Sequence, residues 1–265
     1  MKGKVAVITG GSGTLGKAFA KGLANEGTHV YILNRNTKKA KETVNEFKAN
    51  GLEIKSITCD VLHEKSVESA FNEILKQEVR IDILVNAAGG NKSGATVMPD
   101  QEVFDVSFDQ FRKVTDLNLM GTVIPTLICT KHMAKQGGGS IVNISSMAAM
   151  LPLTRVVGYS ASKAAINNFT QWMAVELANK YSSKIRINAI APGFFIADQN
   201  RTLLLNEDNT LTARGETIIS QTPMKRFGDP EDLISTLLWL CNDKSSFITG
   251  IVVPVDGGFS AFSGV

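Results

Sequence analysis

The sequence predicts an α/β fold in which a doubly wound parallel sheet of seven strands carries helices on both faces. Two observations lead to this prediction. Short runs rich in β-branched residues alternate along the chain with longer segments whose apolar residues recur every three or four positions. The short runs are apolar throughout, which is typical of strands that are covered on both faces. Alternating strands and helices form a parallel sheet, and right-handed crossovers place helices on both sides of it.

Each expected element can be placed in the sequence. The strands are expected at residues 5–9, 29–33, 54–59, 81–87, 139–145, 185–190 and 250–255. The helices are expected at residues 15–27, 37–51, 64–78, 108–136, 158–180 and 230–243. The chain shows no repeat or linker, so residues 1–265 are expected to form a single domain. Residues 194–228, between a strand and a helix, are too long for an ordinary loop, and we expect them to form a substrate loop.

Composition and charge argue against several classes of protein. The 265 residues carry a net charge of +3 without a block of like charges, so we expect no nucleic-acid partner. No run approaches the roughly 18 apolar residues of a membrane span. The three histidines are isolated from other metal-ligating residues, and no metal is expected. The three cysteines lack CxxC spacing and are expected to be reduced thiols in a cytoplasmic protein: Cys59, Cys129 and Cys241.

A glycine-rich turn joins the first expected strand to the first expected helix. It reads Thr9-Gly10-Gly11-Ser12-Gly13-Thr14-Leu15-Gly16. Such a turn brings backbone N–H groups close to a pyrophosphate at a helix N-terminus, where the helix dipole favours an anion. A plain tight turn is the alternative, but the position in the first strand–helix connection favours a dinucleotide.

The end of the second expected strand bears on the choice of dinucleotide. An acidic residue there would bind the ribose 2′-hydroxyl, but this chain has Asn34 followed by Arg35. Because Arg35 is able to pair with a 2′-phosphate, we expect NADP(H) to be favoured. NAD(H) stays an alternative, because Asn34 can itself hydrogen-bond a ribose hydroxyl and an exposed arginine is common.

Tyr159 and Lys163 are the candidates for acid–base chemistry. Their spacing of four places both side chains on one face of a helix. A nearby ammonium, together with a cationic oxidised nicotinamide, favours the phenolate, so we expect the pKa of Tyr159 to lie below its usual value of about 10. Tyr159 would then exchange a proton with a substrate oxygen while hydride moves to or from a nicotinamide. Ser146 follows a strand at the end where such sheets bind ligands, and its hydroxyl suits the same oxygen.

Taken together, these pieces resemble the short-chain dehydrogenase/reductase family, whose members have a Rossmann fold, over essentially the whole chain. The resemblance implies a catalytic tetrad of Asn118, Ser146, Tyr159 and Lys163, in which Asn118 would hold a water that links Lys163 to solvent. Lys163 would also bind the nicotinamide ribose. The segments that carry the resemblance are TGGSGTLG (9–16), CDV (59–61), NAAG (86–89), LNLMG (117–121), ISSM with Ser146, YSASK (159–163), INAIAPG (187–193) and VDGG (255–258).

The resemblance also implies the contacts of the cofactor. Two departures from the family pattern bear on them, since Thr14 replaces a usual glycine and Phe194 stands where a threonine is frequent. Gly13, beside Thr14, would re-form the turn. The implied cofactor-binding residues are Gly10, Ser12, Gly13, Thr14, Leu15, Gly16, Asn34, Arg35, Asp60, Val61, Asn86, Ala87, Gly89, Tyr159, Lys163, Pro192, Gly193 and Ile196.

Several stretches on the substrate side are similar to the D-mannonate oxidoreductase (fructuronate reductase) branch of that family. This similarity implies a small-molecule sugar-acid substrate, and we expect Lys92, Asn200 and Arg201 to bind it with Ser146 and Tyr159, the neighbouring Gln199 being a further candidate. A 3-oxoacyl thioester or gluconate is the alternative substrate, and a non-catalytic nucleotide-binding protein the alternative function. The resemblance further implies a homo-oligomer, either a dimer or a homotetramer. The stretches are AAGGNKSGAT (87–96), PGFFIADQNRTLL (192–204), LTARGETII (211–219), TPMKRFGDP (222–230) and the ending DGGFSAFSGV.

Overall fold

The sheet determines where the site lies. The computed structural model describes residues 1–197 and 200–264, and within them seven parallel strands form one sheet in the order β3-β2-β1-β4-β5-β6-β7. The fold is therefore the predicted doubly wound α/β sheet in a single domain, and each strand lies within two residues of its expected bounds. The strands are β1 (Val5–Thr9), β2 (His29–Asn34), β3 (Ile54–Thr58), β4 (Ile83–Asn86), β5 (Gly139–Ile144), β6 (Ile185–Pro192) and β7 (Val252–Val255).

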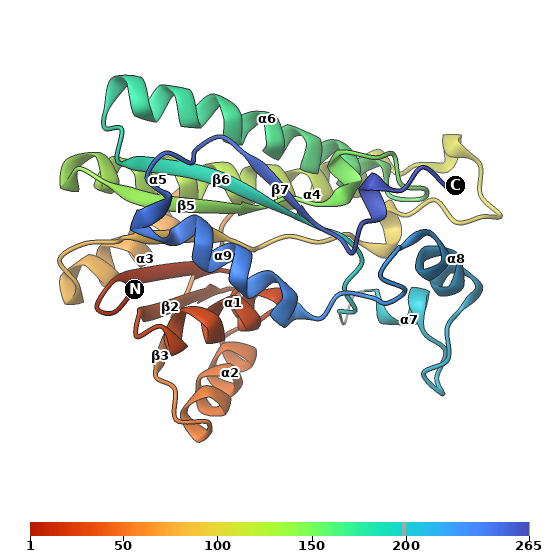
Figure 1. The fold of residues 1–265 in the computed structure, drawn as a ribbon, viewed down its shortest axis with the longest axis horizontal. Helices are drawn as coiled ribbons and strands as arrows, with labels where there is room; N and C mark the ends of the chain where they lie inside the picture. The colour runs from red at the N-terminus through yellow and green to blue at the C-terminus, as the bar shows by residue number, and fades with distance from the viewer. Residues whose placement is uncertain (198–199, 265) are drawn as a thin grey trace.

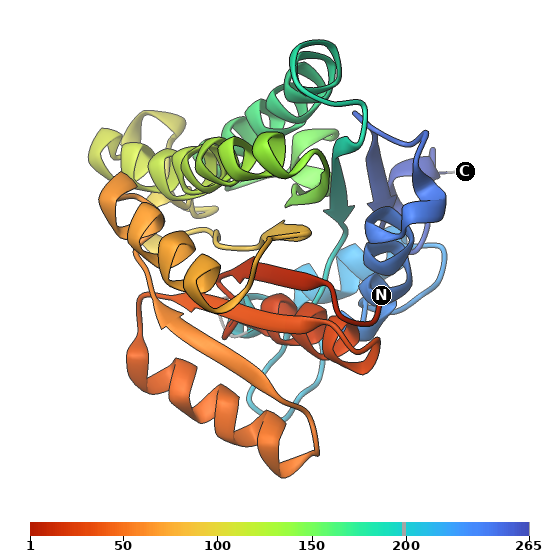
Figure 2. The same cartoon turned by 90° about the vertical axis from the view of Figure 1, so that its left-hand side faces the viewer.

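Helices cover both faces of this sheet (Figures 1 and 2). Helices α3, α5 and α6 pack on one face, where Phe71 and Met133 lie among the buried side chains. Helices α1, α2 and α9 pack on the other face, where Phe19 and Leu240 are buried. The bounds are α1 (Thr14–Asn25), α2 (Thr37–Ala49), α3 (Glu64–Gln77), α4 (Phe108–Thr115), α5 (Gly121–Gln136), α6 (Val157–Lys180), α7 (Arg201–Leu204), α8 (Ala213–Gln221) and α9 (Ile234–Cys241).

The single helix expected over 108–136 is interrupted. A π-helical turn, Asp116–Met120, separates α4 from α5. Within it, the side chain of Asn118 donates to the carbonyl of Val114, and Thr122 donates to the carbonyl of Asn118. Pro125 follows and has no N–H to donate back to Gly121. Single π-helical turns are frequent at functional sites, and this one positions a predicted tetrad residue.

The long segment after β6 has structure of its own. Helices α7 and α8 lie within it, and two isolated bridges, Phe195 with Gly228 and Leu205 with Leu211, close it. It lies at the carboxyl end of the sheet, beside the segments that follow β4 and β5 (Figure 1). We therefore expect the substrate loop at 194–228 to cover this edge of the sheet with its two helices.

The remaining expectations concern groups outside the sheet. The three cysteines are free and buried, as predicted. Over residues 1–197 and 200–264, no three histidine, cysteine or carboxylate side chains cluster in a way that suits a metal ion. Within the same ranges, no helix has the length and hydrophobicity needed to cross a membrane.

Candidate active site

The glycine turn after β1 needs glycine at two positions for steric reasons. Gly10 has φ +65°, and a Cβ there would lie 2.8 Å from the Cα of Ala88. A Cβ at Gly16 would collide with the carbonyl oxygen of Gly10. The N–H of Gly13 closes the turn on the Gly10 carbonyl at 2.9 Å, and Thr14 becomes the first residue of α1. The departure at Thr14 is thus accommodated as expected, with Gly13 in the turn.

The N-terminus of α1 is suited to an anion. Its N-cap is Gly13, which has no side chain, and no side-chain hydrogen bond caps the first turn within the described residues. Uncapped N–H groups and the helix dipole together favour a phosphate. Because the turn is also too crowded for any side chain at Gly10 or Gly16, these residues fit the pyrophosphate of a dinucleotide.

Asn34 holds the glycine turn. Its Oδ1 accepts two hydrogen bonds from Ser12, one from the backbone N–H and one from the hydroxyl, each at 2.9 Å. The Ser12 hydroxyl is therefore already paired. The Nδ2 of Asn34 is buried and has no partner among the described residues. A buried donor without an acceptor is unfavourable, so Nδ2 fits a ribose or phosphate oxygen at this strand end.

The side chain of Arg35 is accessible to an anionic ligand. Its side chain is 74% exposed, and its Nη1 lies 3.8 Å from Oδ2 of Asp60. The Asp60 carboxylate also accepts a hydrogen bond from the backbone N–H of Leu62 at 3.0 Å. An exposed ion pair at this separation contributes little, so the guanidinium can leave Asp60 for a phosphate at small cost. Val61, beside Asp60, is buried.

Lys163 is buried at the carboxyl end of β5. Its Nζ donates to the carbonyl oxygen of Ile144 at 2.7 Å and lies 5.5 Å from the centroid of the Tyr159 ring. Burial lowers the pKa of Lys163 to about 7, because the charged ammonium loses its hydration. The predicted pairing of Tyr159 with Lys163 is present, on one face of α6.

The side chains of Tyr159 and Ser146 lie close together. The pKa of Tyr159 is raised above its usual value because burial disfavours the phenolate, while the nearby Ser146 hydroxyl acts in the opposite direction. In the chain without a nicotinamide the pKa of Tyr159 therefore shifts in the direction opposite to the expected one, because desolvation is the largest influence on the phenol. Ser146 accepts a 3.1 Å hydrogen bond from the N–H of Ala148. The adjacent Ser145 instead donates to Asn167 on α6.

Asn118 joins the π-helical turn to the loop after β4. Its Oδ1 accepts from the N–H of Gly90 at 3.0 Å, and its Nδ2 donates to the carbonyls of Gly90 and Val114, each at 2.8 Å. Both N–H donors are thus in use, and only one lone pair of Oδ1 is left for a water. A Cβ at Gly89 would lie 2.7 Å from Oδ1 of Asn118 and 3.4 Å from Nζ of Lys163. The structure therefore brings Gly89, Asn118 and Lys163 together.

The side chain of Asn86 belongs to a buried hydrogen-bond network. Its Nδ2 donates to Oγ1 of Thr126 and to Oδ1 of Asn143, each at 2.8 Å, and Asn143 donates on to Thr170. Asn86 therefore ties β4 to β5 and α5, while its Oδ1 is buried and, among the described residues, has no partner, which leaves an acceptor for a cofactor. Sequence reasoning missed Thr126, Asn143 and Thr170, although a polar residue at a fully buried strand position signals such a network.

Gly193 lies against β7. Its N–H donates to the carbonyl of Val255 at 2.9 Å, and a Cβ there would lie 2.7 Å from the backbone of Asp256. Pro192 ends β6, and Ile196 follows in the partly buried segment after it. Glycine is thus required at 193 for packing, independently of any contact with a carboxamide.

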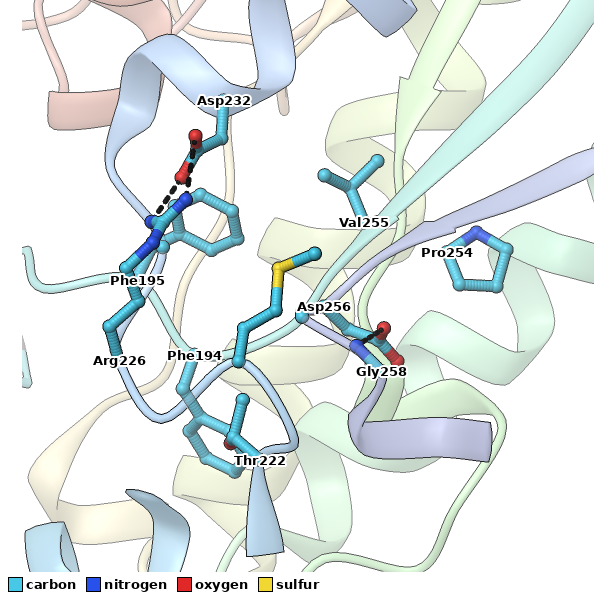
Figure 3. A pocket seen from close by; sticks show the side chains of 12 residues that line it. Phe194, Phe195, Thr222, Arg226, Asp232, Pro254, Val255, Asp256 and Gly258 are labelled. Carbon is cyan, nitrogen blue, oxygen red and sulfur yellow. Dashed lines mark hydrogen bonds and ion pairs between the residues drawn. The ribbon is translucent and has the colours of Figure 1, made fainter. Parts of the chain in front are cut away.

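A cavity of about 370 Å³ is lined by Phe194 and Phe195, the two residues that follow Gly193 in the chain (Figure 3). Its charged members are already paired, since Arg226 bonds Asp232 at 2.6 and 3.1 Å and Asp256 accepts from the N–H of Gly258. None of the tetrad residues lines it, so the cavity is separate from the reacting groups. It is lined by Phe194, Phe195, Thr222, Met224, Arg226, Gly228, Asp232, Pro254, Val255, Asp256, Gly257 and Gly258.

The expected substrate residues have different surroundings. Asn200 shapes its own loop, because Nδ2 donates to the carbonyl of Phe195 and Oδ1 accepts from the N–H of Ala197, each at 2.8 Å. Arg201 is exposed and hydrogen-bonds Asn209. Lys92 is exposed and lies directly after the loop that Asn118 holds. Gln199 lies outside the described residues.

Comparisons with known proteins agree with this arrangement. Residues 4–208 match the family model described as short chain dehydrogenase. The uncharacterized oxidoreductase UxuB of Bacillus subtilis is 47% identical, over 100% of this chain and 98% of its own. The 3-oxoacyl-[acyl-carrier-protein] reductase FabG of Aquifex aeolicus is 35% identical over 97% of this chain and 98% of its own. A crystal structure from Haemophilus influenza, provisionally named D-mannonate oxidoreductase and holding NAD, superimposes with a TM-score of 0.91 at 38% identity, covering 100% and 98% of the two chains.

Proposed function

This chain belongs to the short-chain dehydrogenase family and is an NAD(P)-dependent oxidoreductase, and we propose that it reduces the carbonyl group of a sugar acid. The specific substrate we propose is D-fructuronate, with D-mannonate as the product. Because the chain is an enzyme, the nucleotide-binding protein without catalysis is no longer an alternative.

The observation that carries the substrate class is a set of cations in the segments that follow β4, β5 and β6 at the carboxyl end of the sheet. Lys92 follows β4, Arg155 lies between Ser146 and Tyr159 in the chain, and Arg214 lies on α8. Within the described residues, no carboxylate forms an ion pair with any of the three. An anionic substrate would supply the missing charge. The similarity to the D-mannonate oxidoreductase structure supports the same class.

The geometry of the tetrad supports the following catalytic roles. When bound, the nicotinamide supplies the hydride. Tyr159 donates its proton to the carbonyl oxygen during reduction, and its raised pKa keeps that proton in place at neutral pH. Ser146, which lies close to Tyr159, binds the same oxygen. Lys163 would bind the nicotinamide ribose, and Asn118 holds the loop after β4 through its hydrogen bonds with Gly90.

The cofactor we propose is NADP(H), with NAD(H) as the alternative. No carboxylate stands at the end of β2 to bind a ribose 2′-hydroxyl, and the exposed Arg35 is able to pair with a 2′-phosphate. The unpaired Nδ2 of Asn34 fits either dinucleotide. NAD in the similar crystal structure supports the alternative.

The experiment that tests the substrate class is a panel of carbonyl compounds assayed by nicotinamide absorbance. It contains D-fructuronate, 5-keto-D-gluconate, an acetoacetyl thioester and a neutral keto-sugar, each with NADPH and with NADH. We expect the sugar acids to give the highest kcat/KM. A higher kcat/KM for the thioester would favour the alternative that FabG represents.

Assembly and location are proposed on separate observations. A homo-oligomer, either a dimer or a homotetramer, is supported by large apolar side chains on the surface, among them Trp172 at 58% exposure and Phe262 at 37%. Of the apolar residues near the C-terminus, Phe259 packs edge-on against Phe194 within the chain.

The free, buried cysteines support the cytoplasmic location that the sequence predicts.

A further inference from the structure

Three loops meet beside the reacting groups. The backbone N–H of Val97, in the segment after β4, donates to the carbonyl of Arg155 at 2.9 Å. From the segment after β6, Nη1 of Arg214 donates to Oγ1 of Thr154 at 3.1 Å. Thr154 and Arg155 themselves belong to the segment that joins Ser146 to Tyr159. All three segments lie at the carboxyl end of the sheet, where α8 is seen in Figure 1.

This arrangement holds two like charges close together. Arg214 is half-buried, and its pKa is lowered because burial and the nearby charge of Arg155 both disfavour the guanidinium cation. Arg214 also lies in the first turn of α8, where the helix dipole disfavours a cation. Among residues 1–197 and 200–264, neither arginine has an ion-pair partner. Repulsion of this kind is relieved when an anion binds between the two groups.

The backbone of Arg155 is strained as well. Its φ is +77°, in the left-handed region that costs a residue with a Cβ about 1 kcal/mol or more. Glycine or asparagine would adopt this conformation more easily. The hydrogen bond from Val97 holds the strained turn in place. A strained conformation at a cationic residue, fixed from a second loop, is typical of a site where a side chain must point in a set direction.

We propose that Arg155 and Arg214 together bind the carboxylate of the sugar-acid substrate. The proposal rests on the proposed function and makes it more specific. Arg155 precedes Tyr159 by four residues and α6 by two, and Arg214 bonds the residue before Arg155, so the pair belongs to the segment that leads into the tetrad helix. Two guanidinium groups present several N–H donors in planar forks, which suits a carboxylate better than an ammonium does. Arg201, exposed and bonded to Asn209, is the competing candidate.

The first test compares charged and neutral forms of one substrate. Arg155→Gln, Arg214→Gln and Arg201→Gln are assayed with D-fructuronate and with its methyl ester, which lacks the negative charge. Lys184→Gln, on the exposed residue before β6 at the opposite end of the sheet, is the matched charge-removal control. We expect Arg155→Gln and Arg214→Gln each to lower kcat/KM for the acid by at least about tenfold, mainly through KM, and for the ester by less than about twofold.

Two results would overturn the carboxylate site while leaving the proposed function intact. One is an equal loss on the acid and the ester in both variants, which would mean that the arginines only support the loops. The other is a selective loss on the acid in Arg201→Gln alone, with Arg155→Gln and Arg214→Gln unchanged.

A binding measurement separates the carboxylate site from the proposed function. The enzyme saturated with oxidised cofactor is titrated with D-mannonate and with the uncharged polyol D-mannitol, and heat is measured. We expect D-mannonate to bind at least about tenfold more tightly than D-mannitol, and Arg214→Gln to abolish the difference. Equal affinity of the wild type for the acid and the polyol would overturn the site. A preference for the acid without turnover of any keto-uronate would overturn the proposed function alone.

Discussion

The ammonium of Lys163 lies 5.5 Å from the centre of the Tyr159 ring and is hydrogen-bonded to the Ile144 carbonyl. Burial acts on both groups: it lowers the pKa of Lys163 to about 7 and raises that of Tyr159 above its usual value near 10. Between these two values the chain by itself keeps both groups uncharged. Tyr159 therefore retains its proton at neutral pH, as the proposed reduction of a carbonyl requires.

Tyr159→Phe removes this proton and keeps the ring. We expect kcat for carbonyl reduction to fall by about 10²- to 10⁴-fold, as is usual when a general acid is lost. The affinity for NADPH, measured by fluorescence titration, should change by less than about threefold, because the phenylalanine ring takes the place of the tyrosine ring. A Phe variant that keeps most of the wild-type kcat would show that another group supplies the proton.

Lys163→Met tests the cost of burying an ammonium. In the unfolded chain the lysine pKa is about 10.4, and in the native chain it is about 7. Between these values the unfolded state binds more protons, so the free energy of unfolding of the wild type rises with pH, by up to about 1.4 kcal/mol per unit. Lys163→Met lacks this contribution. Urea unfolding should therefore show that the stability advantage of Lys163→Met shrinks as pH rises from about 7 to about 10.

The control for that experiment is Lys184→Met, on the surface at the other end of the sheet. Its stability should differ from the wild type by a nearly constant amount over the same pH range. Parallel pH curves for Lys163→Met and the wild type would contradict the lowered pKa of Lys163.

Gly89→Ala tests the contact between the loop after β4 and the tetrad. A Cβ at this position would lie 2.7 Å from Oδ1 of Asn118 and 3.4 Å from Nζ of Lys163. Because something must shift, we expect kcat to fall by at least about tenfold, since small displacements of positioned groups are costly in catalysis. Ala88→Ser, one residue earlier, is the control and should keep most of the activity. A Gly89→Ala enzyme with wild-type kcat would show that the tetrad tolerates displacement of Asn118.

Arg35→Ala tests the choice of cofactor. If Arg35 pairs with a 2′-phosphate, its loss should raise KM for NADPH by at least about tenfold and leave KM for NADH nearly unchanged. Initial rates with each cofactor at a fixed substrate concentration provide the measurement. Equal effects on the two cofactors, or a wild-type preference for NADH, would assign ribose binding to Asn34 instead.

Much of the fold could be predicted from the sequence, because hydrophobic periodicity depends on local patterns. All seven strands were expected, and the glycine turn and the Tyr159–Lys163 pair are local motifs as well. The π-helical turn at Asn118 could not be predicted, since it depends on how that side chain meets Gly90 in another segment. The expected bounds of β4 and β7 each began two residues too early, and those of β4 ended one residue too late.

The electrostatics of the site could not be predicted for a similar reason. The sequence places Lys163 one helical turn from Tyr159, but it does not reveal that burial raises the pKa of the phenol. It also does not reveal that Ser12 occupies the acceptor of Asn34, or that Arg214 reaches Thr154 from another loop. Each of these depends on distant segments coming together, which a motif within one segment does not record.

The most direct test of the account is the initial rate of NADPH oxidation with D-fructuronate, followed by identification of the sugar-acid product. The account predicts saturable oxidation of NADPH that yields D-mannonate and is lost in Tyr159→Phe. It also predicts a higher kcat/KM for D-fructuronate than for an acetoacetyl thioester or a neutral keto-sugar. Absence of cofactor oxidation with any keto-uronate, together with turnover of the thioester or the neutral sugar, would contradict it.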